Sequence, residues 1–198
     1  MRMRNPKDKD LVINNCDYYY NGFDNTNPIH LEIGMGKGKF ILEMALKYPE
    51  YNFIGVEKYS SVASVAIKRI NEYKPKNLKI LITDAINLPE ILENKIDTIY
   101  LNFSDPWPKE RHAKRRLTSQ KYLETYDILF KNNAHIIMKT DNDNLFLYSI
   151  DSFINHGYKI VKISYDLHSE EIDNIETEYE EKFSKNGIKI KYIDVKKD

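Results

Sequence analysis

The sequence predicts a doubly wound α/β domain, a mostly parallel sheet with helices on both faces. Two observations carry this prediction. Apolar runs typical of buried strands alternate along the chain with stripes of helical period. The first run, residues 29–33, leads into a turn with glycines at 34, 36 and 38, and an apolar helical pattern follows from Phe40. Strand, glycine-rich turn and helix in succession typically open such a sheet.

The remaining strands are expected where short apolar runs end in turn-forming or acidic residues. The predicted runs after the first are 52–57, 78–83, 97–103, 134–138, 159–166 and 188–195. Helices are expected between them, where apolar residues recur at helical spacing. These are the helix after the glycine turn, a helix over 60–73, a short helix through Leu88 and Leu92, a helix capped by Thr118 and a helix over 145–155.

The spacing of the glycines limits the ligand that the first turn could hold. A dinucleotide fingerprint needs its third glycine at position 39, which is Lys39, and no Gly-Lys-Ser/Thr closes the loop as in a P-loop. The carboxylate of Glu32, inside the first strand, suits a cationic or hydroxyl-bearing ligand better than a diphosphate. A tight turn without any ligand is the alternative interpretation of the same residues.

Composition sets the outer bounds. The 198 residues carry 30 basic and 30 acidic side chains, so any nucleic-acid binding must come from a local basic patch. The single cysteine, Cys16, excludes an internal disulfide and suits a reducing cytoplasm. The first residues do not form a signal peptide, and no apolar stretch is long enough for a bilayer. We expect a cytoplasmic protein without a membrane partner, with no metal site, built as an arm (1–27) and one domain (28–198).

The arm lacks clear periodicity. A short helix is expected near residues 11–18, next to a cluster of three tyrosines at 18–20. These rings could stack on bases, although packing against the domain is the simpler expectation.

Acidic residues end the second and third predicted strands. Glu57 closes the second, where a carboxylate accepts hydrogen bonds from ribose hydroxyls in nucleoside-binding sheets. Asp84 follows the third strand at the same edge. Each also has a structural interpretation, because Glu57 precedes a helix and Asp84 is suited to cap one.

The fourth strand runs into a stiff loop, Ser-Asp-Pro-Trp-Pro-Lys over residues 104–109. Open α/β sheets bind ligands at such strand ends, which makes Asp105 a candidate. The densest basic stretch of the chain follows. It contains Arg111, His112, Lys114, Arg115 and Arg116. A solvated charged face is the usual interpretation of such a run, but its place beside the loop favours phosphate contacts.

Near the C-terminus lies an acidic segment, residues 170–181, which by composition is an exposed, mobile loop or helix. It contains the sequence Thr-Glu-Tyr-Glu at 177–180. The fifth strand ends in Lys-Thr-Asp-Asn at 139–142.

Four motifs together resemble the tRNA (guanine-N7-)-methyltransferase family, whose members are class I S-adenosylmethionine-dependent enzymes. They are Glu-Ile-Gly-Met-Gly-Lys-Gly, Leu-Asn-Phe-Ser-Asp-Pro-Trp-Pro-Lys with its trailing Arg-His, Lys-Thr-Asp-Asn, and Thr-Glu-Tyr-Glu. The resemblance covers the whole chain, although the segment from Cys16 to Pro28 is short for the family. It implies a seven-stranded Rossmann-like sheet with an antiparallel last strand. It also implies methyl transfer from S-adenosyl-L-methionine to N7 of a tRNA guanosine, the variable-loop guanosine at position 46.

The resemblance also implies roles for individual residues. Cofactor contacts fall on Glu32, Gly34, Gly36, Gly38, Glu57, Asp84 and Asp105, substrate contacts on Lys109, Asp141, Thr177, Glu178, Tyr179 and Glu180, and RNA contacts on Arg111, His112, Lys114, Arg115 and Arg116. Asp105 is the candidate catalytic residue, because a carboxylate near the base favours the cation that develops as N7 is methylated. The free lone pair of N7 needs no deprotonation, so positioning is the main task of the protein.

Three alternatives remain at this point. They are a methyltransferase of another RNA, a small-molecule methyltransferase and a non-catalytic RNA-binding module with a degenerate cofactor site. The basic run argues against a small neutral substrate, and the intact glycine turn with its strand-end acids argues against a degenerate site. The protein is expected to be a monomer or a homodimer.

Overall fold

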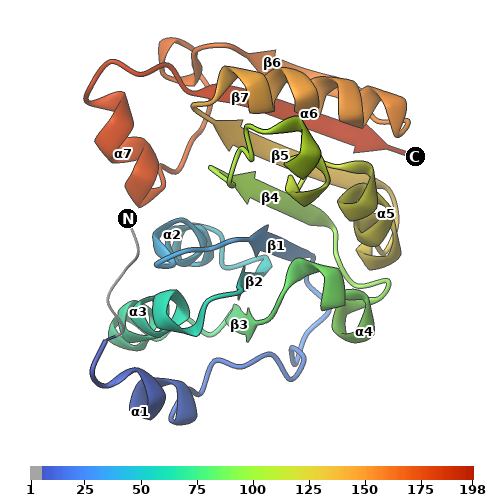
Figure 1. The fold of residues 1–198 in the computed structure, drawn as a ribbon. Coiled ribbons are helices and arrows are strands. Elements are labelled where there is room, and N and C mark those ends of the chain that lie inside the picture. Colours follow the sequence, from blue (N-terminus) through green and yellow to red (C-terminus); the bar gives the residue numbers. More distant parts are fainter. Residues whose placement is uncertain (1–5) are drawn as a thin grey trace.

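The computed structural model describes residues 6–198 and contains a seven-stranded sheet in the order β3-β2-β1-β4-β5-β7-β6 (Figure 1). Its strands are β1 (Ile29–Ile33), β2 (Asn52–Glu57), β3 (Leu78–Ile82), β4 (Thr98–Asn102), β5 (Ala134–Thr140), β6 (Lys159–Ser164) and β7 (Lys191–Lys197). Strands β1 to β5 pair in parallel, whereas β7 lies antiparallel to both β5 and β6. The predicted sheet with an antiparallel last strand is therefore confirmed.

The strand order reverses between β1 and β4, which are direct neighbours although two strands separate them in sequence. In a doubly wound sheet, the loops that leave two such strands diverge to opposite faces and open a crevice at the carboxyl ends. Here those loops are the glycine turn after β1 and the Asp-Pro-Trp-Pro loop after β4. The topology alone places both motifs at one crevice.

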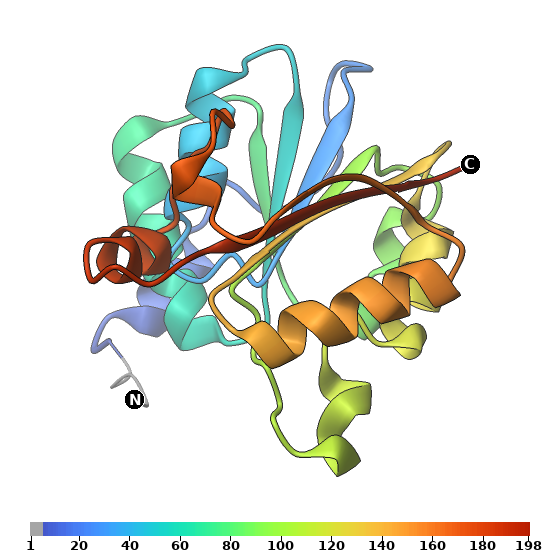
Figure 2. The ribbon, with the colours of Figure 1, turned by 90° about the horizontal axis from the view of Figure 1, so that it is seen from above.

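Helices cover both faces of the sheet, as Figure 2 shows with α2 and α3 on one side and α5 and α6 on the other. The helices are α1 (Lys9–Asn14), α2 (Lys39–Lys47), α3 (Ser60–Tyr73), α4 (Pro89–Leu92), α5 (Gln120–Leu129), α6 (Asp143–Asn155) and α7 (Glu178–Ser184), with short 3₁₀ helices η1 (Ala85–Asn87), η2 (Glu110–Arg115) and η3 (Leu167–Ser169). Two apolar clusters form the core. One joins Phe40, Ile41 and Ile67 of α2 and α3 to the sheet, and the other joins Tyr126 and Phe146 of α5 and α6 to the opposite face.

The described part of the N-terminal arm packs against the domain. Helix α1 contacts α3, and the chain after it extends the edge of the sheet, because Ile80 of β3 donates to the carbonyl of Tyr18 at 2.7 Å and accepts from Tyr20 at 3.0 Å. The tyrosine cluster is therefore a packing element. The start of the arm, residues 1–5, lies outside the described residues.

Several details differ from the sequence-based expectations, among them the last strand, which spans Lys191–Lys197 rather than 188–195. The arm helix spans Lys9–Asn14 rather than residues 11–18. Thr118 is not the cap of α5, since Ser119 occupies that position and the Thr118 hydroxyl instead lies 2.7 Å from the hydroxyl of Ser149 in α6. A buried partner from another helix has replaced the local capping bond. Among residues 6–198, no helix has the length and apolar character needed to cross a bilayer.

Candidate active site at the carboxyl edge of the sheet

The glycine turn is shaped by backbone conformation and by close packing. Gly34, Gly36 and Gly38 all have positive φ, and the amide of Gly34 donates to the carbonyl of Val56 at 2.8 Å. A Cβ on Gly38 would lie 2.9 Å from the Cβ of Ala66 in α3, so the turn lets α2 begin in direct contact with α3. The glycines therefore form a tight strand-to-helix turn. Gly34 and Gly36 have open space beside them on the crevice side.

The acids that follow β2 and β3 lie at the same edge. Glu57 accepts hydrogen bonds from the amides of Gly36 at 3.2 Å and Tyr59 at 2.9 Å, and burial raises the pKa of its carboxyl group. Asp84 caps η1 through the amide of Ile86 and pairs with Lys58 Nζ at 2.6 Å. Although partial burial acts to raise the pKa of Asp84, the bond from Lys58 holds it below its usual value. Glu57 thereby links the second strand to the glycine turn.

Glu32 is a buried carboxylate with an incomplete set of partners. Only 2 % of the residue is exposed, and Oε1 accepts a hydrogen bond from Asn102 Nδ2 at 2.9 Å. Glu32 Oε2 and Asn102 Oδ1 have no partner among the described residues, although both atoms are buried. Burial raises the pKa of Glu32 to about 7. A buried acceptor pair of this kind is costly without a donor and suits a cationic ligand group.

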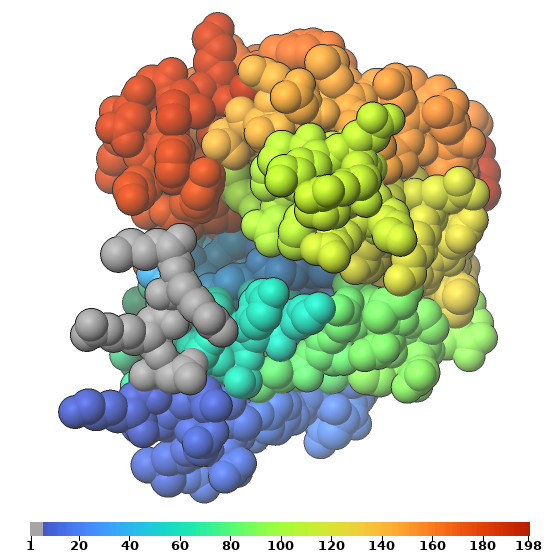
Figure 3. All heavy atoms as spheres, in the orientation of Figure 1, coloured from blue at the N-terminus to red at the C-terminus, as the bar shows by residue number. Residues whose placement is uncertain are grey.

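Two cavities open along this edge. One, of about 580 Å³, is lined by Glu57, Asp84, Asp105, Trp107 and Arg115 among others. The other, of about 600 Å³, lies against α7 and is lined by Glu32, Lys39, Thr177, Glu178 and Tyr179 among others. Gly34, Asn102 and Phe103 line both cavities. Figure 3 shows this region as a hollow bordered by α7 in red and the 105–116 segment in yellow-green.

The loop after β4 is held in an unusual conformation by Arg116. Phe103 and Trp107 have φ of 51° and 42°, values that bulky residues adopt rarely. Arg116 donates to the carbonyls of Pro106 at 3.0 Å and Trp107 at 3.1 Å, and its guanidinium lies 4.3 Å from the ring centre of Tyr148. Arg116 is only 8 % exposed. Two donors of the guanidinium are therefore used inside the loop, and the RNA contact expected of Arg116 stays a prediction.

The other basic residues of this run face outward. Arg111, Lys114 and Arg115 are exposed, and within residues 6–198 none of them forms an ion pair with a carboxylate. Arg115 lies over the Trp107 ring at 4.9 Å, and His112 packs edge-on against the same ring. The run thus offers positive charge to solvent beside Asp105, which is itself exposed.

The acidic segment, residues 170–181, is less exposed than its composition predicts. Thr177 caps α7 in a reciprocal capping box with Glu180, and Glu180 is fully buried. Its side chain pairs with Lys139 at the end of β5, so the predicted exposure is wrong for this residue. Tyr179 stays exposed, packs against Phe103 and donates to Asp141 Oδ2 at 3.2 Å.

The structure brings most of the predicted site residues to one crevice, but not all. Lys109 and Asp141 line neither of the two large cavities, and neither does Glu180. The sequence analysis missed Asn102, Phe103 and Lys139. A signal for Lys139 was present, since this lysine directly follows the apolar residues 136–138. The partner that neutralises it, however, lies 41 residues further along the chain.

Known methyltransferases resemble this chain over most of its length. A family model described as a putative methyltransferase matches residues 26–193. The tRNA (guanine-N(7)-)-methyltransferase of Macrococcus caseolyticus is 44 % identical, with 99 % of this chain and 100 % of that protein covered. The enzyme of the same name from Oceanobacillus iheyensis is 50 % identical over 83 % of this chain and 78 % of that protein.

Solved structures with little sequence identity share the fold. The 16S rRNA methyltransferase KamB superposes with a TM-score of 0.65 at 12 % identity, covering 98 % of this chain and 94 % of that one. A methyltransferase described as antibiotic-related gives a TM-score of 0.64 at 19 % identity, with 98 % and 96 % covered. The glycine turn, the acids at the strand ends and the sequence relatives lead to one conclusion: the chain belongs to the tRNA (guanine-N7-)-methyltransferase family.

Proposed function

We propose that this protein transfers the methyl group of S-adenosyl-L-methionine to N7 of a guanosine in tRNA. Family membership supports the reaction, and one observation on this chain carries the proposal. Glu32 and Asn102 keep buried acceptor atoms that have no partner within residues 6–198, at the floor of a crevice that begins at the glycine turn. An ammonium group would satisfy both acceptors, and the cofactor has such a group on its methionyl part.

The residues of the crevice fit the rest of the cofactor. Glu57 would accept hydrogen bonds from the ribose hydroxyls, and Asp84 lies further along the same cavity, toward the adenine end. Gly34 and Gly36 leave room for close approach, since no atom lies within 4 Å of a Cβ built on either residue. When bound, the cofactor supplies an electrophilic methyl group on a sulfonium.

The remaining groups position guanine and tRNA. The cavity of about 580 Å³, lined by Glu57 and Asp84, is the cofactor cavity of this proposal. Asp105 lies on its rim, where it would face the base and favour the positive charge that develops at N7. The cavity of about 600 Å³, which Glu32 also lines, has Thr177, Glu178 and Tyr179 as its opposite wall. There they would orient the base. Lys109 and Asp141 would contact tRNA at the rim, outside the cavities.

The exposed cations next to Asp105 would hold the tRNA backbone. Arg111 and Lys114 are exposed, while Arg115 and His112 pack on Trp107 with their polar ends available to phosphates. Because the overall charge is zero, this local patch must supply the attraction for RNA. A small neutral substrate would need no such patch.

The finer assignments belong to the same proposal. The target is the variable-loop guanosine at position 46, and the enzyme works in the cytoplasm as a monomer or homodimer, without a metal. Residues 28–198 act as one methyltransferase domain with residues 1–27 as an arm.

The test is methylation of unmodified tRNA with radiolabelled cofactor, followed by mapping of the modified nucleotide. We expect label at N7 of the variable-loop guanosine and none in a tRNA that carries adenosine there. Label at another guanosine would correct the position, whereas label in another RNA or only in small molecules would overturn the substrate. Binding of S-adenosylhomocysteine, measured by calorimetry, identifies a folded cofactor site in each preparation.

A further inference from the structure

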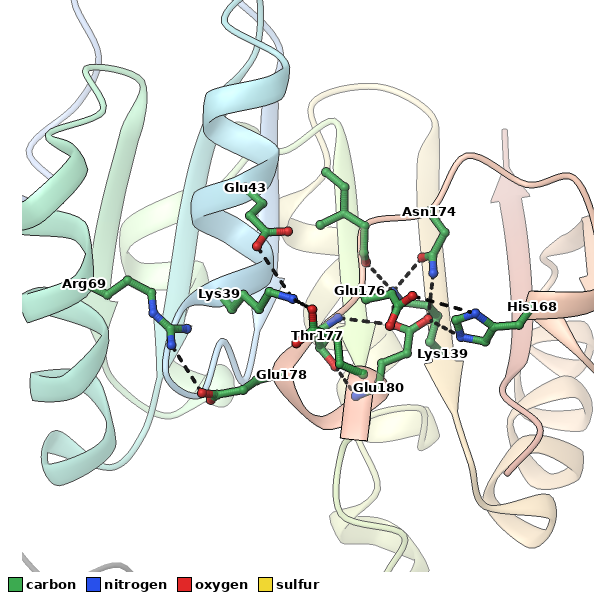
Figure 4. Close-up of polar contacts among 12 residues, drawn as sticks. Lys39, Glu43, Arg69, Lys139, His168, Asn174, Glu176, Thr177, Glu178 and Glu180 are labelled. Carbon is green, nitrogen blue, oxygen red and sulfur yellow. Dashed lines mark hydrogen bonds and ion pairs between the residues drawn. The ribbon is translucent and has the colours of Figure 1, made fainter. Parts of the chain in front are cut away.

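Helix α7 is joined to the sheet by a buried ion pair. Lys139, the second-last residue of β5, is 3 % exposed, and Glu180, in the first turn of α7, is 0 % exposed. Lys139 Nζ lies 2.6 Å from Glu180 Oε2, and Figure 4 shows the two side chains meeting between the helix and the strand. Removing one member of a buried pair leaves the other charge uncompensated, which makes such a pair costly to break.

All polar atoms of this pair have partners inside the protein. Lys139 Nζ also donates to Asn174 Oδ1 and to the carbonyl of Ile175, both at 2.9 Å. Glu180 Oε1 accepts from Asn174 Nδ2 at 2.7 Å and lies 3.2 Å from His168 Nε2. Glu180 Oε2 accepts, in addition to the lysine, the amide of Thr177 at 3.3 Å. Glu180 Oε2 therefore accepts two hydrogen bonds and Oε1 accepts one, with His168 Nε2 close to it, and the residue is fully buried away from the cavities.

The other ion pairs of α7 lie at the surface. Glu178 lies 3.3 Å from both Lys37 of the glycine turn and Arg69 of α3, and Glu181 pairs with Lys39 (Figure 4 shows Lys39, Arg69 and Glu178). The carboxylates of Glu178 and Glu181 are each more than 40 % exposed, so these contacts contribute little on their own. The Lys139–Glu180 pair is the buried ion pair between α7 and the sheet.

The position of α7 matters because its first turn forms one wall of the cavity. Thr177, Glu178 and Tyr179 line the space that Gly34, Asn102 and Phe103 connect to the cofactor cavity. Lys139 and Glu180 lie behind this wall, and neither lines that space.

We propose that Lys139 and Glu180 are positioning residues: their buried pair holds α7 so that Thr177, Glu178 and Tyr179 face the guanine, and Glu180 does not contact the base. This inference rests on the proposed function. It predicts that methylation depends on the docking of α7 and not on a carboxylate at position 180.

The experiment compares five proteins: the unmodified enzyme, Glu180→Met, Lys139→Met, the double variant with both changes, and Glu181→Gln as a control. Glu181→Gln removes an exposed ion pair from the same helix. Two methionines are chosen for the double variant because apolar side chains of similar length can replace a buried ion pair without loss of docking. Each protein is measured for kcat and KM with tRNA, for amide hydrogen exchange over residues 177–184, and for S-adenosylhomocysteine binding to count the folded sites.

We expect each single methionine variant to lose at least tenfold in kcat per folded site, with KM for tRNA within threefold, and to lose exchange protection in α7. The double variant should regain protection and most of kcat, and Glu181→Gln should change neither. Activity and protection must rise and fall together across the five proteins. A variant that is protected but inactive, above all the double variant, would show that the carboxylate of Glu180 acts on the substrate and would overturn the inference.

A variant that stays active with α7 unprotected would overturn it as well. If the unmodified enzyme itself fails to methylate tRNA, the proposed function fails, and this result is distinct from any difference among the variants.

Discussion

Two buried glutamates at the same edge of the sheet differ in where their counter-charge lies. Glu180 Oε2 lies 2.6 Å from Lys139 Nζ, and both carboxylate oxygens of Glu180 accept hydrogen bonds within the protein. Glu32 has one hydrogen bond from Asn102 and a second oxygen with no partner among the described residues. Lys139 acts on Glu32 only at longer range, and burial still raises the pKa of Glu32 to about 7.

The difference separates a carboxylate that is neutralised within the protein from one that a bound cation would neutralise. A carboxylate that is neutralised inside the protein has no capacity left for a ligand, as at Glu180. A carboxylate buried without a partner destabilises the free protein, and that cost is relieved when a cation binds. Nearness to the site does not distinguish the two residues, whereas the set of partners does.

The arginines of the loop after β4 repeat this comparison for cations. Arg116 uses its donors on the carbonyls of Pro106 and Trp107, while Arg115 keeps its polar end exposed over the Trp107 ring. Adjacent residues of the same type thus have different surroundings, because Arg116 is buried in the loop and Arg115 is exposed to solvent. Substitutions at these residues test both contrasts.

The largest effect is expected from Lys139→Ala. It leaves the Glu180 carboxylate buried and uncompensated, which costs about 3–5 kcal/mol. Because α7 can separate from the sheet, we expect the loss to appear as local opening of residues 170–184, measured by amide hydrogen exchange. Lys47→Ala, which removes an exposed partner of Asp173 in the same segment, serves as the control. Unchanged protection in Lys139→Ala would mean that the pair does not hold the helix.

Glu32→Gln should raise the free energy of unfolding of the ligand-free protein, whereas Lys139→Ala lowers it. The folded pKa of Glu32 is raised from 4.5 to about 7, so the folded state favours the protonated form and stability falls as pH rises between these values. The amide removes this loss and stabilises the ligand-free protein by about 3 kcal/mol above the folded pKa, and by nothing below pH 4.5. Denaturant unfolding at several pH values measures the difference.

The same substitution should weaken binding of S-adenosylmethionine, because the ammonium loses its charged acceptor. In the unmodified enzyme, binding should release a proton when measured below about pH 7, which calorimetry detects in buffers of different ionisation enthalpy. A stabilised variant with unchanged cofactor affinity would remove Glu32 from the binding site.

Arg116→Ala should lower the free energy of unfolding by about 2–3 kcal/mol, since two carbonyls lose a charged donor. Arg115→Ala, the matched change at the next residue, should alter stability by less than about 0.5 kcal/mol. Thermal and denaturant unfolding of both variants test this. If Arg116→Ala is as stable as Arg115→Ala, the carbonyl contacts of Arg116 do not brace the loop.

The smallest effect per residue is expected for the outward cations. Replacing Arg111, Lys114 and Arg115 by alanine should raise KM for tRNA and flatten the log–log salt dependence of binding by roughly 0.7–0.9 for each phosphate that the variant no longer neutralises. Stability should stay the same, in contrast to Arg116→Ala. A salt slope identical to that of the unmodified enzyme would return these residues to the role of a solvated face.

Features that depend on residues close together in the chain could be predicted from the amino-acid sequence alone. The glycine turn, the acids Glu57 and Asp84 at the ends of their strands, and the order of strands and helices follow from local periodicity and backbone preference. Strand ends of a parallel sheet meet at one edge, so the crevice could be predicted once the strands were recognised. The four motifs sufficed for the family.

Which charged residues are neutralised within the protein depends on tertiary contacts and could not be predicted from the sequence. Glu180 and Lys139 are 41 residues apart, and the acidic composition around Glu180 predicted exposure, yet the fold buries both together. Arg116 turns inward because the loop after β4 folds back within reach of its guanidinium. Charge in a sequence shows that a counter-charge is needed, but its location depends on contacts between distant segments. The fold therefore distinguishes Glu32, which forms no ion pair among the described residues, from Glu180, which pairs with Lys139.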